Sequence, residues 1–156
     1  MKKINALLLL VVIVAACKDD DPKLTVEQYL TAPTNGWVFE TLMITVPGST
    51  LEVNAMTTPP FSEGYDDACE KDDATIFATD GKYTVANNTK CEDTEGDPVD
   101  TGTWTLSSDK TSLTIDSNDD VAFTVTKLAI DDTHISGEID NFLGLGIHAK
   151  VTLARK

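Results

Sequence analysis

The chain has 156 residues, the size of one compact domain rather than two. Apolar residues make up 41% of it, so it can bury a core and is not a disordered acidic tail. Its formal net charge of −14 repels phosphate backbones and argues against a nucleic-acid partner. With only two histidines, His134 and His148, and three cysteines, histidine-based catalysis and multi-ligand zinc sites are poorly supplied.

The N-terminus carries the pattern of an export signal. Two lysines follow Met1, and Ala6–Ala16 is then an apolar run of 11 residues without a charge. A helix that crosses a bilayer needs about 20 apolar residues, so this run is too short for a stable membrane span. A basic start, a short apolar stretch and small residues, in that order, are typical of a secretory signal peptide. The alternative, a buried core helix, fits less well because the run lies at the extreme start of the chain.

The residues around Cys17 resemble two lipoprotein motifs. Val14-Ala15-Ala16-Cys17 resembles the lipobox of bacterial lipoproteins, which implies that a signal peptide of residues 1–16 is cleaved and that acyl chains such as palmitate are attached to Cys17. Two acyl chains hold a protein firmly to a membrane. Lys18-Asp19-Asp20-Asp21 resembles a signal that sends lipoproteins of some Gram-negative bacteria to the outer face of the outer membrane. The resemblance implies a lipidated acidic tether over residues 17–24 and a cell-surface location, with the periplasmic side of the outer membrane as the alternative.

If Cys17 carries lipid, Cys69 and Cys91 are the two cysteines that remain. Disulfides persist in exported proteins, so we expect these two residues to form one. A catalytic thiol is one alternative, but it needs a base, and neither histidine is close in sequence. A metal site is another, but two cysteine ligands do not hold zinc.

Beyond the tether, the sequence predicts one short helix followed by strands. Thr25 and Gln28 have the spacing of a capping box, which predicts a helix over Val26–Thr31 that ends near Pro33 and closes one end of the domain. Short runs of Val, Ile, Thr and aromatic residues between turn residues then predict strands. The expected strands are Trp37–Val46, Thr50–Met56, Ala74–Ala78, Lys82–Ala86, Gly102–Leu106, Ser112–Asp116, Val121–Ile130, Thr133–Ile139 and Ile147–Leu153. Short connections favour antiparallel neighbours, and no helical pattern separates the strands, so the fold class is all-β.

Two local patterns allow finer predictions. Asp80-Gly81 predicts a type I′ turn in a β-hairpin, since both residues tolerate positive φ angles. Phe123 and Val125 alternate with polar residues, but Lys127 falls where the next apolar residue is due. This slip predicts either a β-bulge at that point of the strand or a strand that crosses the rim of a barrel.

The middle of the chain resembles a known family. Its motifs are a cysteine before an acidic pair, a Phe-x-x-Asp-Gly-x-Tyr hairpin, a second cysteine and a Gly-x-Trp strand: Cys69, Asp72-Asp73, Phe77–Tyr83, Cys91 and Gly102–Trp104. These motifs resemble the lipocalin-like lipoproteins of Gram-negative bacteria. The resemblance implies an up-and-down antiparallel β-barrel of eight or nine strands over residues 25–156, often with a cavity for a small apolar ligand.

Aromatic residues on the expected strands are the candidate ligand contacts. They are Trp37, Phe39, Phe77, Tyr83, Trp104 and Phe123, with ordinary core packing as the alternative for each. We expect a lipid-anchored, non-catalytic module of the cell envelope that binds a small hydrophobic molecule and needs no cofactor. The alternative is a structural or adhesive surface lipoprotein with a filled core, which acts through its loops. An envelope enzyme or inhibitor would need a cleft with converging polar groups.

Two long loops, Thr57–Asp73 and Asn87–Thr101, are strongly acidic. Calcium prefers oxygen ligands, so these loops and Asp116–Asp120 are candidate calcium sites. The last segment lacks the glycine and the glutamate of a calcium-binding loop. Acidic segments of this kind more often form solvated surface, so we expect no metal.

Overall fold

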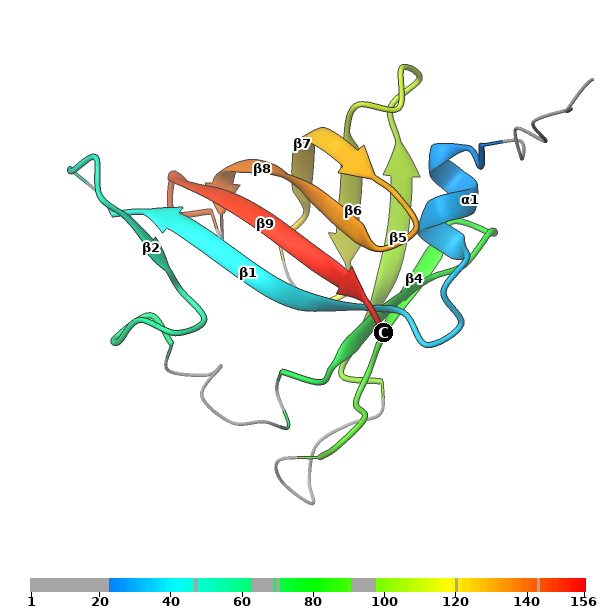
Figure 1. Ribbon diagram of the computed structural model, residues 1–156, viewed down its shortest axis with the longest axis horizontal. Helices are drawn as coiled ribbons and strands as arrows, with labels where there is room; N and C mark the ends of the chain where they lie inside the picture. Colours follow the sequence, from blue (N-terminus) through cyan, green and yellow to red (C-terminus); the bar gives the residue numbers. More distant parts are fainter. Residues whose placement is uncertain are drawn as a thin grey trace, which may run out of the picture.

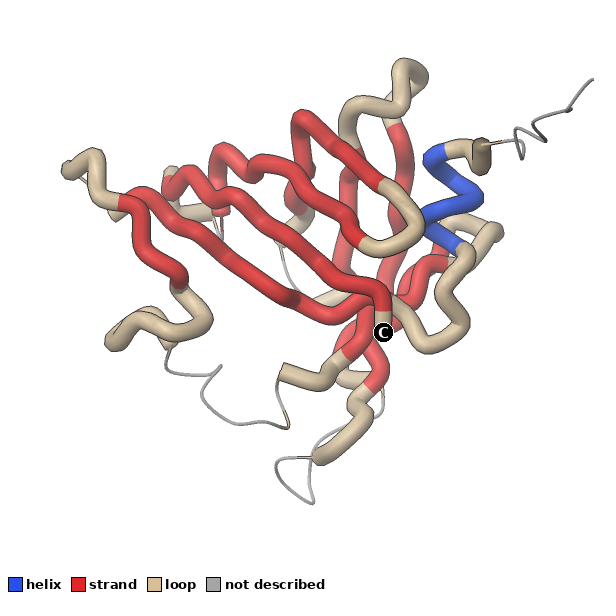
Figure 2. Tube along the Cα trace, viewed as in Figure 1, coloured by secondary structure: helices blue, strands red, loops and turns tan. Residues whose placement is uncertain are grey.

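The computed structural model describes residues 23–46, 48–62, 69, 71–90, 98–119, 121–142 and 144–156. Within them the chain forms one helix and nine strands (Figures 1 and 2). The elements are α1 (Val26–Thr31), β1 (Trp37–Thr45), β2 (Glu52–Asn54), β3 (Ala74–Phe77), β4 (Lys82–Ala86), β5 (Asp100–Leu106), β6 (Leu113–Ser117), β7 (Phe123–Ile130), β8 (His134–Phe142) and β9 (Ile147–Arg155). The predicted all-β fold class is therefore confirmed. None of the helices in the described residues is long and apolar enough to cross a membrane.

The strands form a closed antiparallel barrel. From β3 to β9 each strand pairs with the next one in the chain, and β9 pairs with β1. A single register pair, Trp37 with Thr75, joins β1 to β3 and completes a barrel of 8 strands. The remaining strand, β2, pairs only with the end of β1, from Met43 to Thr45. It is shorter than the predicted strand Thr50–Met56, because the chain turns after Asn54.

The strand irregularity predicted at Lys127 is confirmed. Lys127 has a φ of 50°, and the register between β7 and β8 shifts between Thr126 and Ala129. Phe123 and Val125 line the barrel interior before the bulge, whereas Leu128 packs against the core after it. A β-bulge adds one residue to a strand, so the apolar side chains on both sides of it can face inward.

The hairpin between β3 and β4 differs from its prediction in turn type. A type I′ turn requires positive φ at both central residues, but in this hairpin only Gly81 has one, at 82°. The Gly81 N–H donates to the carbonyl of Ala78 at 3.1 Å, and the Ala78 N–H donates to the carbonyl of Lys82 at 2.8 Å. The turn is therefore one residue longer than predicted, with the left-handed glycine last, an arrangement common in three-residue hairpin loops.

The short helix α1 closes one end of the barrel, which we name the closed end. Thr25 caps the helix by accepting a hydrogen bond from the Gln28 N–H, and the Gln28 side chain accepts one from the Thr25 N–H, as the capping box predicts. The helix packs against β3 and β7 at the end of the barrel where β1 begins (Figure 1). Its Leu30 side chain is buried, and the Leu30 carbonyl accepts a hydrogen bond from Trp37 Nε1 at 2.9 Å.

Candidate ligand-binding cavity

The barrel interior contains a cavity of about 260 Å³. All strands of the closed barrel contribute to its lining, and most lining side chains are apolar. The lining consists of Phe39, Leu42, Thr75, Phe77, Tyr83, Val85, Asp100, Leu113, Ile115, Phe123, Val125, Ile135, Ile139, Phe142, Val151 and Leu153. Ligand pockets have volumes of about 300 Å³ and above, so this cavity lies just below that range. An apolar, concave space of this kind suits one small molecule.

Among the described residues, Asp100 is the one carboxylate that interrupts the mostly apolar lining. Its Oδ2 accepts a hydrogen bond from Tyr83 Oη at 2.7 Å. Its Oδ1 accepts hydrogen bonds from Ser117 Oγ at 2.9 Å and from the Thr101 N–H at 2.7 Å. Asp100 is half-buried, and these donors from β4, β5 and β6 fix its orientation. A carboxylate held in this way is preorganised to meet a polar group of a ligand.

Asp100 lies between the interior and a second hollow that opens at the far end of the barrel from α1. This hollow has a volume of about 160 Å³ and shares Asp100, Phe123 and Phe142 with the interior cavity. Ser117 and Asn141, near the ends of β6 and β8, also line it. We name this region, where β5 and β7 begin and β8 ends, the open end.

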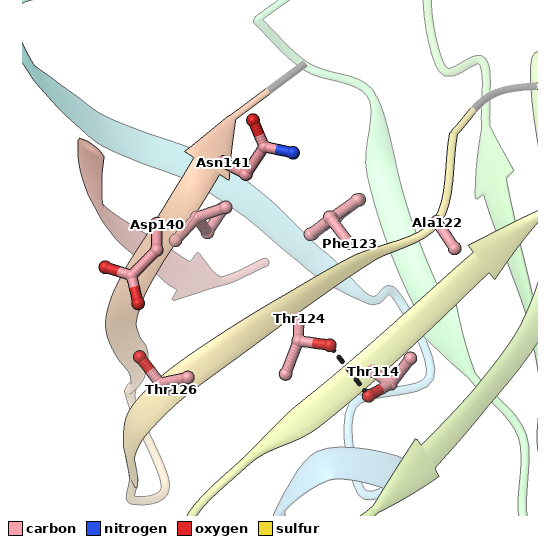
Figure 3. A pocket seen from close by; sticks show the side chains of 8 residues that line it. Thr114, Ala122, Phe123, Thr124, Thr126, Asp140 and Asn141 are labelled. Atoms are coloured by element: carbon pink, nitrogen blue, oxygen red, sulfur yellow. Dashed lines mark hydrogen bonds between the residues drawn. The ribbon is translucent and has the colours of Figure 1, made fainter. Parts of the chain in front are cut away.

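A cleft of about 290 Å³ separates the first half of β7 from the second half of β8 (Figure 3). The two strands pair from Thr126, opposite Glu138, toward the closed end. Phe123 and Thr124, nearer the open end, have no register partner on β8. Thr124 instead bonds to Thr114 of β6, with 3.0 Å between the hydroxyl oxygens. Phe123 and Ile139 line both this cleft and the interior cavity, so these two side chains belong to the wall between them.

Four of the six predicted contact residues line the interior cavity, and their contact with a ligand stays a prediction. They are Phe39, Phe77, Tyr83 and Phe123. Phe39 is nevertheless 38% exposed. β1 and β3 pair only at Trp37 and Thr75, so β3 does not cover the part of β1 that carries Phe39. Phe77 packs edge-on against another aromatic ring, that of Trp104, at a centroid distance of 5.9 Å.

The other two, Trp37 and Trp104, are buried at the closed end and lie outside the cavity lining. A buried indole needs an acceptor for its N–H. Trp37 has the Leu30 carbonyl of α1, and Trp104 Nε1 lies 3.0 Å from the carbonyl oxygens of both Ala78 and Lys82. These tryptophans therefore tie the helix and the β3–β4 hairpin to the barrel.

Asp100 is a site residue that was not predicted, because it falls within the predicted acidic loop Asn87–Thr101. The structure begins β5 at Asp100. A signal was present, since Asp100, Gly102 and Trp104 alternate along the strand and share its inward face. Extending the predicted strand Gly102–Leu106 by two residues toward the N-terminus, one repeat of this alternation, would have included Asp100.

The two histidines lie on the outer surface near carboxylates. His134 Nε2 lies 3.5 Å from Glu40, and His148 Nδ1 lies 3.1 Å from Asp140. Nearby, a hydrogen bond from Lys127 is the main cause that lowers the pKa of Glu138 below its ordinary value. No group of three or more metal-ligating His, Cys, Asp or Glu side chains occurs in the described part of the chain.

The predicted cysteine modifications stay predictions. Cys69 lies in a half-buried turn, but Cys91 lies outside the described residues, as does Cys17 with its expected lipid. The expected signal peptide, residues 1–16, and all but the last two residues of the tether, 17–24, also lie outside them.

A closed antiparallel barrel with an apolar interior and one open end is an architecture typical of proteins that bind small molecules. The sequence of residues 33–136 matches the model of the lipocalin-like domain. That match covers more than half of the chain, so the protein belongs to the lipocalin-like domain family. Neither a curated protein nor a solved structure gave a match. The lipocalin-like fold is typically a binding fold without catalytic activity.

Proposed function

We propose that this protein is a lipid-anchored lipocalin-like module of the Gram-negative cell envelope that binds a small apolar molecule inside its barrel. The observation that carries the proposal is the interior cavity of about 260 Å³. A domain that needs only a stable core fills its interior, because packing contacts are lost around any void. Here Phe123 and Phe142 stay half-buried at the open end instead of closing the space.

The position of α1 supports a particular orientation on the membrane. The proposed tether, residues 17–24, leads directly into α1, which lies at the closed end. Acyl chains on Cys17 would therefore hold the closed end nearer to the outer membrane. The open end would then point away from that membrane, so the module would receive its ligand from the aqueous side or from a neighbouring protein.

Native mass spectrometry tests the binding function. The purified protein is incubated with an extract of small apolar cell metabolites, and we expect a bound mass that disappears in Val85→Phe, a variant that fills the cavity. Val85 lines the cavity and is half-buried, so this change is milder than one in the deepest part of the core. Val38→Phe is the matched control, because Val38 belongs to β1 but does not line the cavity. A bound mass that persists in Val85→Phe would place the ligand outside the barrel.

Metabolic labelling with palmitate tests the anchor separately. We expect the label in the unaltered protein and none in Cys17→Ser. Digestion of intact cells with an added protease then tests the location, since a protein on the outer face is cut and one on the periplasmic side is protected. A labelled Cys17→Ser variant would refute the proposed attachment site.

A second candidate function is an adhesive surface lipoprotein that acts through its loops. It is favoured by exposed apolar side chains at loop tips: Val121 is 71% exposed and Leu145 is 67% exposed. Val121 and Gly144, the residue before Leu145, line the same hollow at the open end, and clustered exposed apolar residues are typical of interaction surfaces. Loss of cell or matrix adhesion in a Val121→Ser, Leu145→Ser double variant, with ligand binding intact, would support this function.

A further inference from the structure

We propose that the cavity selects an apolar molecule with a protonated amine head over one with a carboxylate or phosphate head. This inference rests on the proposed binding function and names its ligand class. It is carried by the position and hydrogen bonding of Asp100, the only charged side chain among the described residues that line the interior.

Asp100 has hydrogen-bonding capacity that the described residues do not use. A carboxylate has about four acceptor positions, two on each oxygen. In the described part of the chain Oδ1 accepts two hydrogen bonds and Oδ2 accepts one, from Tyr83 Oη. One position on Oδ2 is thus left for a donor from the ligand. Only a head group that carries N–H or O–H can use it, which an ionised carboxylate or phosphate diester cannot.

No positive charge in the described lining compensates the negative charge of Asp100. Among the described residues, no Lys, Arg or His lines the interior cavity, the hollow at the open end or the β7–β8 cleft. The formal net charge of the whole chain, −14, adds repulsion of anions at longer range. An anionic head beside Asp100 would bring two like charges together in a partly dry site, which is unfavourable.

Aromatic side chains line the same hollows as the Asp100 carboxylate. Phe123 and Phe142 line both hollows that Asp100 joins, and Tyr83 bonds to it directly. The faces of aromatic rings attract cations electrostatically. A carboxylate that shares its hollows with aromatic rings therefore favours an ammonium group over a neutral hydroxyl. The apolar side chains of the lining, such as Val85 and Leu153, accommodate the hydrocarbon part.

The experiment uses three probes with one hydrocarbon chain and different heads: octylamine, octanol and octanoate. Each is titrated calorimetrically into the full-length protein at neutral pH, and into Asp100→Asn, which keeps an acceptor oxygen but removes the charge. Asp116→Asn is the matched control, because Asp116 lies one strand away on β6, is exposed and lines none of the three hollows.

We expect octylamine to bind about 10- to 100-fold more tightly than octanoate, the range of a charge-assisted hydrogen bond, with octanol between them. Asp100→Asn should remove this preference by weakening octylamine and strengthening octanoate, whereas Asp116→Asn should leave it. Octanoate or octanol binding as tightly as octylamine, or a preference that survives in Asp100→Asn, would overturn the inference and leave the binding function intact. If none of the three probes binds the unaltered protein, the binding function itself is refuted. The comparison within the unaltered protein decides the inference even if Asp100→Asn does not fold.

Discussion

The two ends of the barrel differ in packing, although the same strands form both. At the closed end, Trp37 is 1% exposed, and its indole N–H reaches the carbonyl of Leu30 in α1. At the open end, Phe123 and Phe142 are half-buried beside a carboxylate, Asp100, and line a hollow. The closed end thus pairs the Trp37 indole within the protein, whereas the open end has half-buried apolar surface and an acceptor position on Asp100 that no described residue uses.

The wall of the barrel shows the same contrast. β8 and β9 stay in register from His134 to Ile139, opposite Ala154 to Ala149. β7 and β8 share only three register pairs, all on the closed-end side of Phe123. A wall that separates toward the open end lowers the number of contacts that must be broken when a ligand passes. Stability should therefore depend mainly on one end and binding on the other.

Trp37→Ala should have the largest effect on stability. Replacing a fully buried aromatic residue by alanine lowers the free energy of unfolding by about 3–5 kcal/mol, and this change also removes the hydrogen bond to α1. Phe123→Ala, at the half-buried open end, should cost about 1–2 kcal/mol because less area is removed from contact. Urea unfolding of both variants measures the difference.

Ligand titration of the same two variants completes the test. Phe123→Ala should weaken binding more than Trp37→Ala, measured at a temperature where both variants are folded. If Phe123→Ala destabilised the protein as much as Trp37→Ala, the two ends would not be specialised, and the contrast between them would be wrong.

Gly102→Ala should have the next largest effect. A methyl group at this position would overlap the backbone oxygen of Asp116 and lie 2.8 Å from the Tyr83 ring. Backbone cannot move aside as a side chain does, so we expect a loss of about 2–3 kcal/mol in the free energy of unfolding. Because Tyr83 holds Asp100, binding of octylamine should weaken as well.

Gly144→Ala is the control for that substitution. Gly144 has a φ of 71°, but nothing lies within 4 Å of the position of an added methyl group. Only backbone strain opposes the change, so it should cost about 1 kcal/mol. Equal losses at the two glycines, measured by urea unfolding, would show that the close approach around Gly102 relaxes at little cost.

The sequence predicted features that depend on neighbouring residues in the chain. The capping box of Thr25 and Gln28 and the slip at Lys127 each act within a few residues, and both appear as predicted. The roles of Trp37 and Asp100 were not predictable in this way. Trp37 finds its partner in α1, and Asp100 finds Tyr83 and Ser117 17 residues away on each side. Which end of a barrel a strand residue occupies depends on the closure of the whole sheet, so alternation alone assigns a face but not an end.

The ion pair between Glu27 and Lys110 should contribute little to the closed end. It joins α1 to the turn between β5 and β6, and both side chains are largely exposed. Exposed ion pairs contribute about 0–1 kcal/mol. A double-mutant cycle with Glu27→Gln and Lys110→Gln should therefore give a coupling of about 0.5 kcal/mol that falls further in high salt. A coupling several times larger would mean that α1 is held at the closed end by charge as much as by Leu30 and Trp37.

The smallest expected effect is a shift in the acid limit of stability at the β7–β8 turn, also at the closed end. Hydrogen bonds from the hydroxyl and the N–H of Thr133, and from the N–H of His134, lower the pKa of Asp131 from 3.8 to about 2. Because folding lowers this pKa, the stability that Asp131 contributes is fully present above about pH 4 and is lost as the pH falls through about 2. Thr133→Val removes the hydroxyl, the largest cause, so the pKa of Asp131 should rise toward 3.8 and the loss should begin at higher pH. Titration of the Asp131 carboxyl carbon by NMR measures this rise. Thr124→Val, which removes a hydroxyl at the open end, should leave the pKa of Asp131 unchanged, and an equal shift in both variants would mean that the two ends of the barrel are not independent.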